Sequence, residues 1–83
     1  MKAMYFSTKW CQPCKALKPI VQEVSRESNI QVDFIDAEDH SDLAQQFKIT
    51  SVPTIIVIKD NRPVVRHTGM ATKQQISSLF SQN

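Results

Sequence analysis

The sequence predicts an α/β fold in which a four-stranded mixed sheet carries helices on both faces. Two observations support this class: β-branched runs alternate with stretches of helical period, and the resulting order of elements is β-α-β-α-β-β-α. A strand-helix-strand opening of this length implies a parallel pair of strands, and a hairpin near the C-terminus adds antiparallel strands. With 83 residues and no visible repeat or linker, the chain is expected to form one domain over residues 1–83.

A strand, a long helix and a second strand occupy the first part of the chain. The apolar residues 3–6 predict a short buried strand, and residues 30–35 predict another. The helix between them begins near Cys11, is expected to kink at Pro19, and ends by residues 28–29. Its apolar side chains recur at i, i+3, i+4 and i+7, and these are Leu17, Ile20, Val21 and Val24.

The middle of the chain predicts a short helix and a central strand. The helix is expected over residues 41–47, with Asp39 or Ser41 as its N-cap. The most apolar run of the sequence, residues 52–58, is rich in β-branched side chains, which favour a strand in the interior of the sheet.

The last part of the chain predicts a hairpin and a helix. Asp60 and Asn61 tolerate left-handed backbone conformations, so a tight turn is expected there. It leads into an edge strand over residues 64–68. Thr72 and Gln75 have the spacing of a capping box, which predicts the start of the final helix.

Composition and charge exclude several functional classes. The formal charge is +2, from 10 basic and 8 acidic residues dispersed along the chain, so no basic patch for nucleic acid is expected. No apolar run approaches the ~18–20 residues that span a bilayer, and the first residues lack the apolar stretch of a secretory signal. A cytoplasmic protein is therefore expected, and two cysteines in that reducing compartment indicate catalysis or metal binding rather than a structural staple.

The most informative motif is Cys11-Gln12-Pro13-Cys14, placed where the first strand becomes the first helix. A thiol at a helix N-terminus faces unpaired backbone N–H groups, which stabilise its nucleophilic thiolate form. The spacing returns the second sulphur after about one helical turn, and Pro13 suits an early helical position. Cys11 is expected to be the exposed attacking thiol, and Cys14 the shielded thiol that resolves the mixed disulfide.

Other uses of the cysteine pair fit the sequence less well. Structural zinc takes four ligands, of which this motif supplies two, and His40 and His67 lack the spacing that completes such a site. Covalent haem attachment needs a histidine where Lys15 stands. A structural disulfide across so short a loop adds little chain-entropy stabilisation. No metal and no organic cofactor is therefore expected, and both histidines are interpreted as solvent-facing residues without a role.

Three spaced features resemble the thioredoxin family. The stretch WCQPCK, residues 10–15, is similar to the family's active-site pattern WCGPCK, with Gln12 in place of glycine. Residues 52–54, Val-Pro-Thr, resemble the family's cis-proline segment, and Gly69 stands where thioredoxins carry a glycine beside the active site. The resemblance covers the whole chain, which nevertheless lacks the leading strand-helix unit of full-length thioredoxins.

This resemblance implies a substrate-binding rim around Cys11 and a cis peptide bond before Pro53. The backbone of Val52 would then pair with an extended substrate segment like an added strand. Simpler interpretations remain open: Val52 as a core residue, Trp10 as a surface-packing aromatic and Gly69 as a helix-entry or bulge glycine. The residues assigned to the rim are Trp10, Pro13, Val52, Pro53 and Gly69.

Two departures from the family pattern occur together. Typical thioredoxins place a buried aspartate where this chain has Tyr5, and its lysine partner aligns with Phe34. Losing one member alone would leave an uncompensated buried charge, whereas losing both can be neutral or stabilising. We expect an aromatic pair to replace the ionic one, and the proton of Cys14 to move through water or the Tyr5 hydroxyl.

The resemblance implies a thiol–disulfide oxidoreductase that reduces protein disulfides through a mixed-disulfide intermediate. A monomer is expected, with an external reductase such as thioredoxin reductase restoring the dithiol. One alternative is a glutaredoxin-like enzyme recharged by glutathione, although glutaredoxins usually carry paired glycines near the last helix, where this chain has only Gly69. The other is a non-catalytic binding module with the same fold, which would not need both cysteines.

Overall fold

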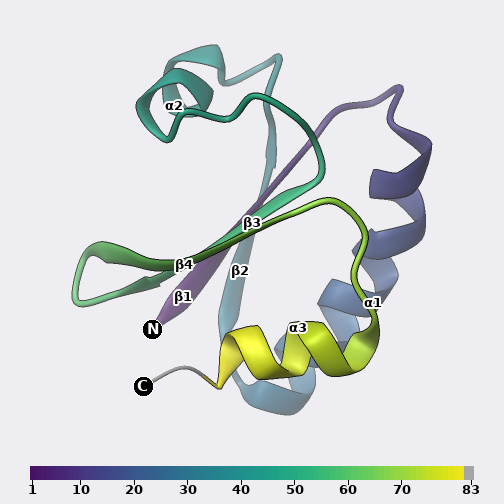
Figure 1. Ribbon diagram of the computed structural model, residues 1–83, viewed down its shortest axis with the longest axis vertical. Coiled ribbons are helices and arrows are strands. Elements are labelled where there is room, and N and C mark those ends of the chain that lie inside the picture. Colours follow the sequence, from purple (N-terminus) through teal and green to yellow (C-terminus); the bar gives the residue numbers. More distant parts are fainter. Residues whose placement is uncertain (82–83) are drawn as a thin grey trace.

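The computed structural model describes residues 1–81, so the last two residues of the expected domain lie outside the described part. Its elements follow the predicted order (Figure 1). The strands are β1 (Lys2–Ser7), β2 (Gln31–Asp36), β3 (Thr54–Lys59) and β4 (Arg62–Thr68). The helices are α1 (Gln12–Ser28), α2 (Ser41–Gln46) and α3 (Lys73–Phe80).

The four strands form one mixed sheet in the order β2-β1-β3-β4. Strands β1 and β2 are parallel, because α1 carries the chain back before β2 begins. The pairs β1–β3 and β3–β4 are antiparallel. Tyr5, near the middle of β1, lies opposite Phe34 on β2 and Ile55 on β3. The predicted fold class is confirmed.

Helices cover both faces of the sheet, with α1 and α3 on one face and α2 on the other (Figure 1). The alternation of side chains along β1 explains this arrangement, because successive residues of a strand point to opposite faces. Tyr5 packs in the cluster under α1 and α3, whereas Met4 and Phe6 pack under α2. The larger cluster contains Ala3, Tyr5, Leu17, Val21, Val24, Ile30, Ile55, Val57, Ala71, Ile76 and Phe80.

Helix α1 has a defined cap at each end. Cys11 is its N-cap, and Asn29 ends it in the left-handed conformation with φ 57°, close to the predicted end. The helix passes through Pro19 as a single element. No helix within residues 1–81 has the length and apolar character needed to cross a membrane.

Helix α2 begins at Ser41 as predicted and ends at Gln46, one residue early, but its predicted N-cap is wrong. The N-cap is His40, which makes no side-chain capping bond, rather than Asp39 or Ser41. The preceding loop is organised from further upstream, because the carboxylate of Asp36 accepts hydrogen bonds from the backbone N–H groups of Glu38 (2.8 Å) and Asp39 (3.1 Å). The Asp36 side chain therefore orders the loop before α2 but does not cap the helix.

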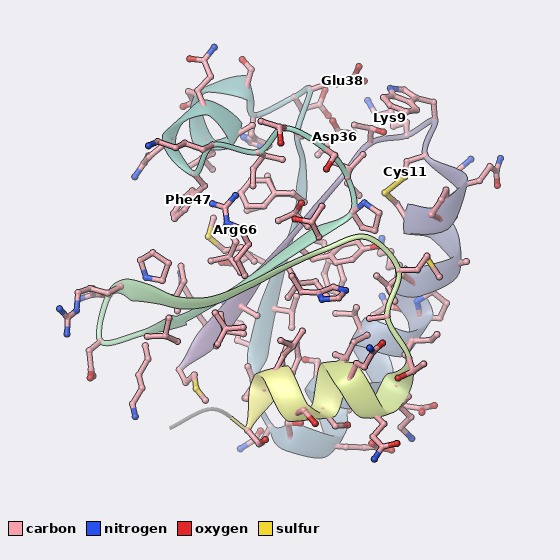
Figure 2. The ribbon with its side chains drawn as sticks, viewed as in Figure 1. Lys9, Cys11, Asp36, Glu38, Phe47 and Arg66 are labelled. Carbon is pink, nitrogen blue, oxygen red and sulfur yellow. A yellow bond between two sulfur atoms is a disulfide. The ribbon has the colours of Figure 1, made fainter. Side chains whose placement is uncertain are left out.

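The strand after α2 begins at Thr54, two residues later than predicted. The Val52–Pro53 peptide bond is cis, as the family resemblance implied, and Pro53 precedes the strand instead of pairing within it. Arg66 on β4 braces this connection by donating to the carbonyl oxygens of Phe47 and of Lys48, the latter at 3.2 Å (Figure 2).

The hairpin turn occurs where it was predicted. Asp60 and Asn61 adopt φ values of 54° and 65°, the left-handed pair that suits a two-residue turn between twisted strands. Strand β4 therefore starts at Arg62, two residues earlier than expected.

The capping box at the start of α3 is confirmed. The Thr72 hydroxyl accepts from the Gln75 backbone N–H at 3.1 Å, and the Gln75 side chain accepts from the Thr72 backbone N–H at 2.8 Å. Both ends of the box are therefore satisfied, which fixes where the last helix begins.

We predict that Thr72→Ala lowers the free energy of unfolding by about 1 kcal/mol, because one helix-end N–H loses its partner. Thr72→Ser keeps a hydroxyl at the same position and is expected to retain most of the stability. Urea denaturation of both variants checks this, and equal losses in both would contradict the capping role.

Candidate active site

Cys11 and Cys14 form a disulfide at the junction of β1 and α1 (Figure 2). Their Cα atoms are 5.3 Å apart, a normal separation for bonded cysteines. Strand β1 ends at Ser7, and a short loop delivers Cys11 to the N-cap position of the helix. The structure therefore brings the two sulphurs together as their spacing predicted.

The backbone of the first helical turn points a hydrogen-bond donor at the outer sulphur. The N–H of Cys14 lies 3.2 Å from Cys11 Sγ, and the N–H of Lys15 donates to the carbonyl oxygen of Cys11 at 3.2 Å. Cys11 itself has an extended backbone, which is usual for an N-cap. When the disulfide is reduced, the same N–H and the positive end of a 17-residue helix face the Cys11 thiolate.

Solvent exposure does not distinguish the two cysteines. Cys11 is 5% exposed and Cys14 is 3% exposed, so the expectation of an exposed Cys11 is wrong for this disulfide form. The reason is that Cys11 Sγ packs toward the loop before β3, 3.9 Å from the carbonyl oxygen of Val52. The cysteines differ instead in their surroundings, because Cys11 faces the Val52 loop whereas Cys14 lines a separate pocket beside β2.

The loop between α2 and β3 supplies part of the predicted rim. Val52 is half-buried beside Cys11, and Pro53 is buried. Gly69 reaches the same place from the end of β4, where its N–H donates to the carbonyl oxygen of Pro53 at 2.8 Å. Its φ of +97° is a conformation that residues with a side chain rarely adopt. The role of Gly69 is therefore to hold the Pro53 carbonyl through its own backbone N–H. A Cβ added at this position would meet no atom within 4 Å.

Trp10 and Pro13 flank Cys11 along the chain, Trp10 directly before it and Pro13 in the first turn of α1. Trp10 is 66% exposed, and its indole N–H donates to Glu38 Oε2 at 3.1 Å. Pro13 is exposed in the first turn of α1. Glu38 was not predicted as a site residue, because only the β2–α2 loop brings it near Trp10. A shallow groove of about 390 Å³ runs from Trp10 to Val52, and its lining includes Ala37, Ile49 and Ser51.

Tyr5 lies beneath the disulfide and anchors the first turn of the helix. Its side chain is fully buried, and its hydroxyl donates to the carbonyl oxygen of Cys14 at 2.7 Å. Its ring meets the ring of Phe34 edge-on, with centroids 5.5 Å apart. The expected aromatic pair is therefore present. Burial raises the pKa of Tyr5 to about 12. The Tyr5 hydroxyl donates its hydrogen bond to a carbonyl oxygen and stays protonated at neutral pH. These two properties argue against the expected transfer of the Cys14 proton through Tyr5.

The histidines stay outside this arrangement. His40 is exposed, as expected, but His67 is half-buried, with its Nε2 3.0 Å from the carbonyl oxygen of Met70. Within residues 1–81, no three histidine, cysteine or acidic side chains gather as a metal site would require.

A disulfide that caps a helix directly after a strand, with a cis-proline loop against its outer sulphur, defines a dithiol–disulfide exchange site. A family model described as Thioredoxin matches residues 3–82, and the chain belongs to the thioredoxin family. It is accordingly a thiol–disulfide oxidoreductase with the cysteine pair of that family.

Individual relatives agree with this assignment. The chain is 33% identical over 79 residues to a thioredoxin of Chlamydia caviae, a match that covers 94% of this chain and 78% of that protein. It is 28% identical over 85 residues to a thioredoxin of Staphylococcus haemolyticus, covering 100% of this chain and 82% of that one. Among solved structures, a point mutant of a thioredoxin from Halobacterium salinarum superposes with a TM-score of 0.90 at 26% identity, covering 94% of this chain and 69% of that chain.

The buried hydroxyl of Tyr5 gives a pH-dependent prediction. Tyr5→Phe is expected to lower the free energy of unfolding by about 1 kcal/mol at pH 8, because the Cys14 carbonyl loses a buried donor. The folded pKa of about 12 lies above the ordinary value of 10.0. The stabilisation is therefore complete below about pH 10 and is lost as the pH rises through about 12.

Two measurements check this behaviour. Tyr5 is the only tyrosine, so tyrosinate absorbance reports it directly, and its midpoint should lie near pH 12 in the folded protein. Urea denaturation should show the advantage of the wild type over Tyr5→Phe shrinking by about 1 kcal/mol between pH 8 and pH 11. A midpoint near 10 in the folded protein would contradict the buried hydrogen bond.

Proposed function

We propose that the protein reduces disulfide bonds in other proteins, with Cys11 as the attacking thiolate and Cys14 as the resolving thiol. The observation that carries the proposal is the Cys14 N–H held 3.2 Å from Cys11 Sγ at the helix N-terminus. Only Cys11 receives this stabilisation, because Cys14 lies inside the first turn. The two sulphurs therefore have different tasks despite their similar burial.

The reaction proceeds in two exchanges. The Cys11 thiolate attacks one sulphur of a substrate disulfide, forming a Cys11–substrate disulfide and releasing the other substrate sulphur as a thiolate that takes up a proton. Cys14 then loses its proton and attacks Cys11 Sγ, which releases the second substrate thiol. Two electrons pass to the substrate, and the protein ends with the Cys11–Cys14 disulfide seen in the structure.

The rim around Cys11 gives this chemistry a place for the substrate chain. We assign to Val52 the role of pairing its backbone with an extended substrate segment, which its carbonyl, 3.9 Å from Cys11 Sγ, favours. The exposed indole of Trp10, which lines a groove with Val52, and the exposed ring of Pro13 offer apolar contacts near Cys11. Gly69 contributes indirectly, by tethering the Pro53 carbonyl.

An external enzyme must return the pair to the dithiol. Thioredoxin reductase is our first candidate, because the relatives that match along nearly the whole chain are thioredoxins, and glutathione is the alternative. We propose that the protein acts as a single-domain monomer, without an organic cofactor, since the cysteines themselves carry the electrons. A reducing compartment such as the cytoplasm suits this role.

Substitution of the two cysteines separates their tasks. In an insulin-reduction assay with dithiothreitol, Cys11→Ser is expected to fall to the rate of dithiothreitol alone, because the attacking thiolate is gone. Cys14→Ser retains attack but lacks resolution, so the pre-reduced variant, mixed with insulin after dithiothreitol has been removed, should accumulate a covalent Cys11–substrate adduct of defined mass. An active Cys11→Ser variant, or a Cys14→Ser variant that forms no adduct, would exclude the assigned roles.

The electron donor is decided by the same insulin-reduction assay without dithiothreitol. NADPH with thioredoxin reductase should sustain turnover, whereas glutathione with glutathione reductase should not. The reverse result would replace the thioredoxin-type cycle by the glutaredoxin-like one.

A further inference from the structure

A second cavity lies beside the cysteine pair, and Thr8 lines both this cavity and the groove between Trp10 and Val52. It has a volume of about 270 Å³ and lies between the start of α1 and the end of β2. Cys14 belongs to its lining, whereas Cys11 does not. The complete lining is Ser7, Thr8, Lys9, Cys14, Lys15, Lys18, Phe34, Ile35 and Asp36.

The charge of this cavity is predominantly positive, with three lysines and one carboxylate in its lining. Lys9 is paired with Asp39 at 3.4 Å. Asp36 accepts two backbone hydrogen bonds, and the N–H groups of Asp39 and then Glu38 hold the pKa of its carboxyl below its usual value.

The other two lysines of the lining have no carboxylate partner among residues 1–81. Within the described part of the chain, neither Lys15 nor Lys18 has an acidic group within salt-bridge distance. Their positive charge is therefore left available to the cavity that Cys14 lines.

Lys18 is the cation best placed to act on Cys14. The two residues are separated by four positions on α1, so their side chains lie on the same face about one turn apart. The ammonium group of Lys18 is also held in place, 5.3 Å from the centre of the Phe34 ring. Phe34 in turn packs edge-on against Tyr5, whose hydroxyl bonds the Cys14 carbonyl.

We propose that Lys18 is a positioning residue for the second exchange: its charge favours the Cys14 thiolate, and the cavity carries the proton from Cys14 to solvent. This inference rests on the proposed function and deepens it. The step is the loss of one proton from Cys14 to water in the cavity, followed by attack of its thiolate on Cys11 Sγ.

The groups packed around Cys14 leave few other routes for its proton. On β1, beneath it, Tyr5 stays protonated at neutral pH and donates to a carbonyl. On β2, Phe34 stands where the family's lysine is expected, and the backbone hydrogen bonds from Asp39 and Glu38 lower the pKa of Asp36, which makes its carboxylate a weaker proton acceptor. On α1 and the loop before it, the charged groups facing the cavity are Lys9, Lys15 and Lys18.

The floor of the cavity also suits water. The hydroxyl oxygen of Thr8, another lining residue, is buried without a hydrogen-bond partner within residues 1–81. Buried hydroxyls of this kind are normally satisfied by ordered water.

A neutral disulfide probe separates the two exchanges kinetically. Reduced protein is mixed with 4,4′-dithiodipyridine in a stopped-flow instrument, and the released thiopyridone is followed by absorbance. The first phase is attack by Cys11, and its rate rises with probe concentration. The second phase is resolution by Cys14, which is independent of probe concentration and must vanish in Cys14→Ser.

Lys18→Met keeps the apolar stem over Phe34 and removes the charge. It is expected to slow the second phase about two- to fivefold at pH 7 and low ionic strength, the effect of one charge about a helical turn away in a solvated site. The difference in second-phase rate between the wild type and Lys18→Met should become smaller at high pH, where Cys14 is fully ionised, and also with added salt. Lys18→Arg should restore the rate, and Lys59→Met, at the far end of β3, is the matched control.

The outcomes distinguish this inference from the proposed function. A second phase that is unchanged in Lys18→Met at every pH, or slowed equally in Lys59→Met, overturns the role of Lys18. Equal slowing of both phases also overturns it, because the loss would then be a general one. If the wild type shows no second phase at all, the two-step mechanism itself fails.

Discussion

The hydrogen bond from the Cys14 N–H to Cys11 Sγ is the interaction on which the rest of the site depends. It exists because β1 ends shortly before the N-cap, so that Cys11 enters α1 with its sulphur over the unpaired amides of the first turn. The sheet fixes the strand, and the packing of α1 against α3 and the sheet fixes the helix. The substrate rim, the order of the two exchanges and the role of Cys14 all take their geometry from this junction.

The region beneath the cysteines shows how the family's site can be built without a buried ion pair. Tyr5 and Phe34 fill the space with packed rings, and the one polar atom introduced, the Tyr5 hydroxyl, is satisfied by the Cys14 carbonyl. This solution avoids the desolvation cost of two buried charges. The replacement also removes the family's aspartate as a proton acceptor near Cys14. The lysine-lined cavity beside Cys14 is a different environment for the Cys14 proton.

Much of this organisation could be predicted because it depends on short-range sequence patterns. The element order, the capping box at Thr72, the left-handed turn at Asp60 and the redox motif all depend on residues within a few positions of one another. At the site, the errors arose where distant segments meet. Burial of Cys11 depends on the Val52 loop, and the bond between Trp10 and Glu38 joins loops that only the parallel β1–β2 pairing brings together. The cavity that Lys18 lines likewise forms only when α1 packs beside the end of β2.

Titration of the Cys11 thiol shows whether the start of α1 stabilises its thiolate. The rate of alkylation by iodoacetamide, measured against pH in the reduced Cys14→Ser variant, reports the thiolate of Cys11 alone. We predict a midpoint clearly below the value of about 8.5 for free cysteine, because the amide of residue 14 and the helix dipole stabilise the anion. A midpoint at or above that value would show that the helix terminus does not activate this sulphur, and the assignment of Cys11 as the nucleophile would fall with it.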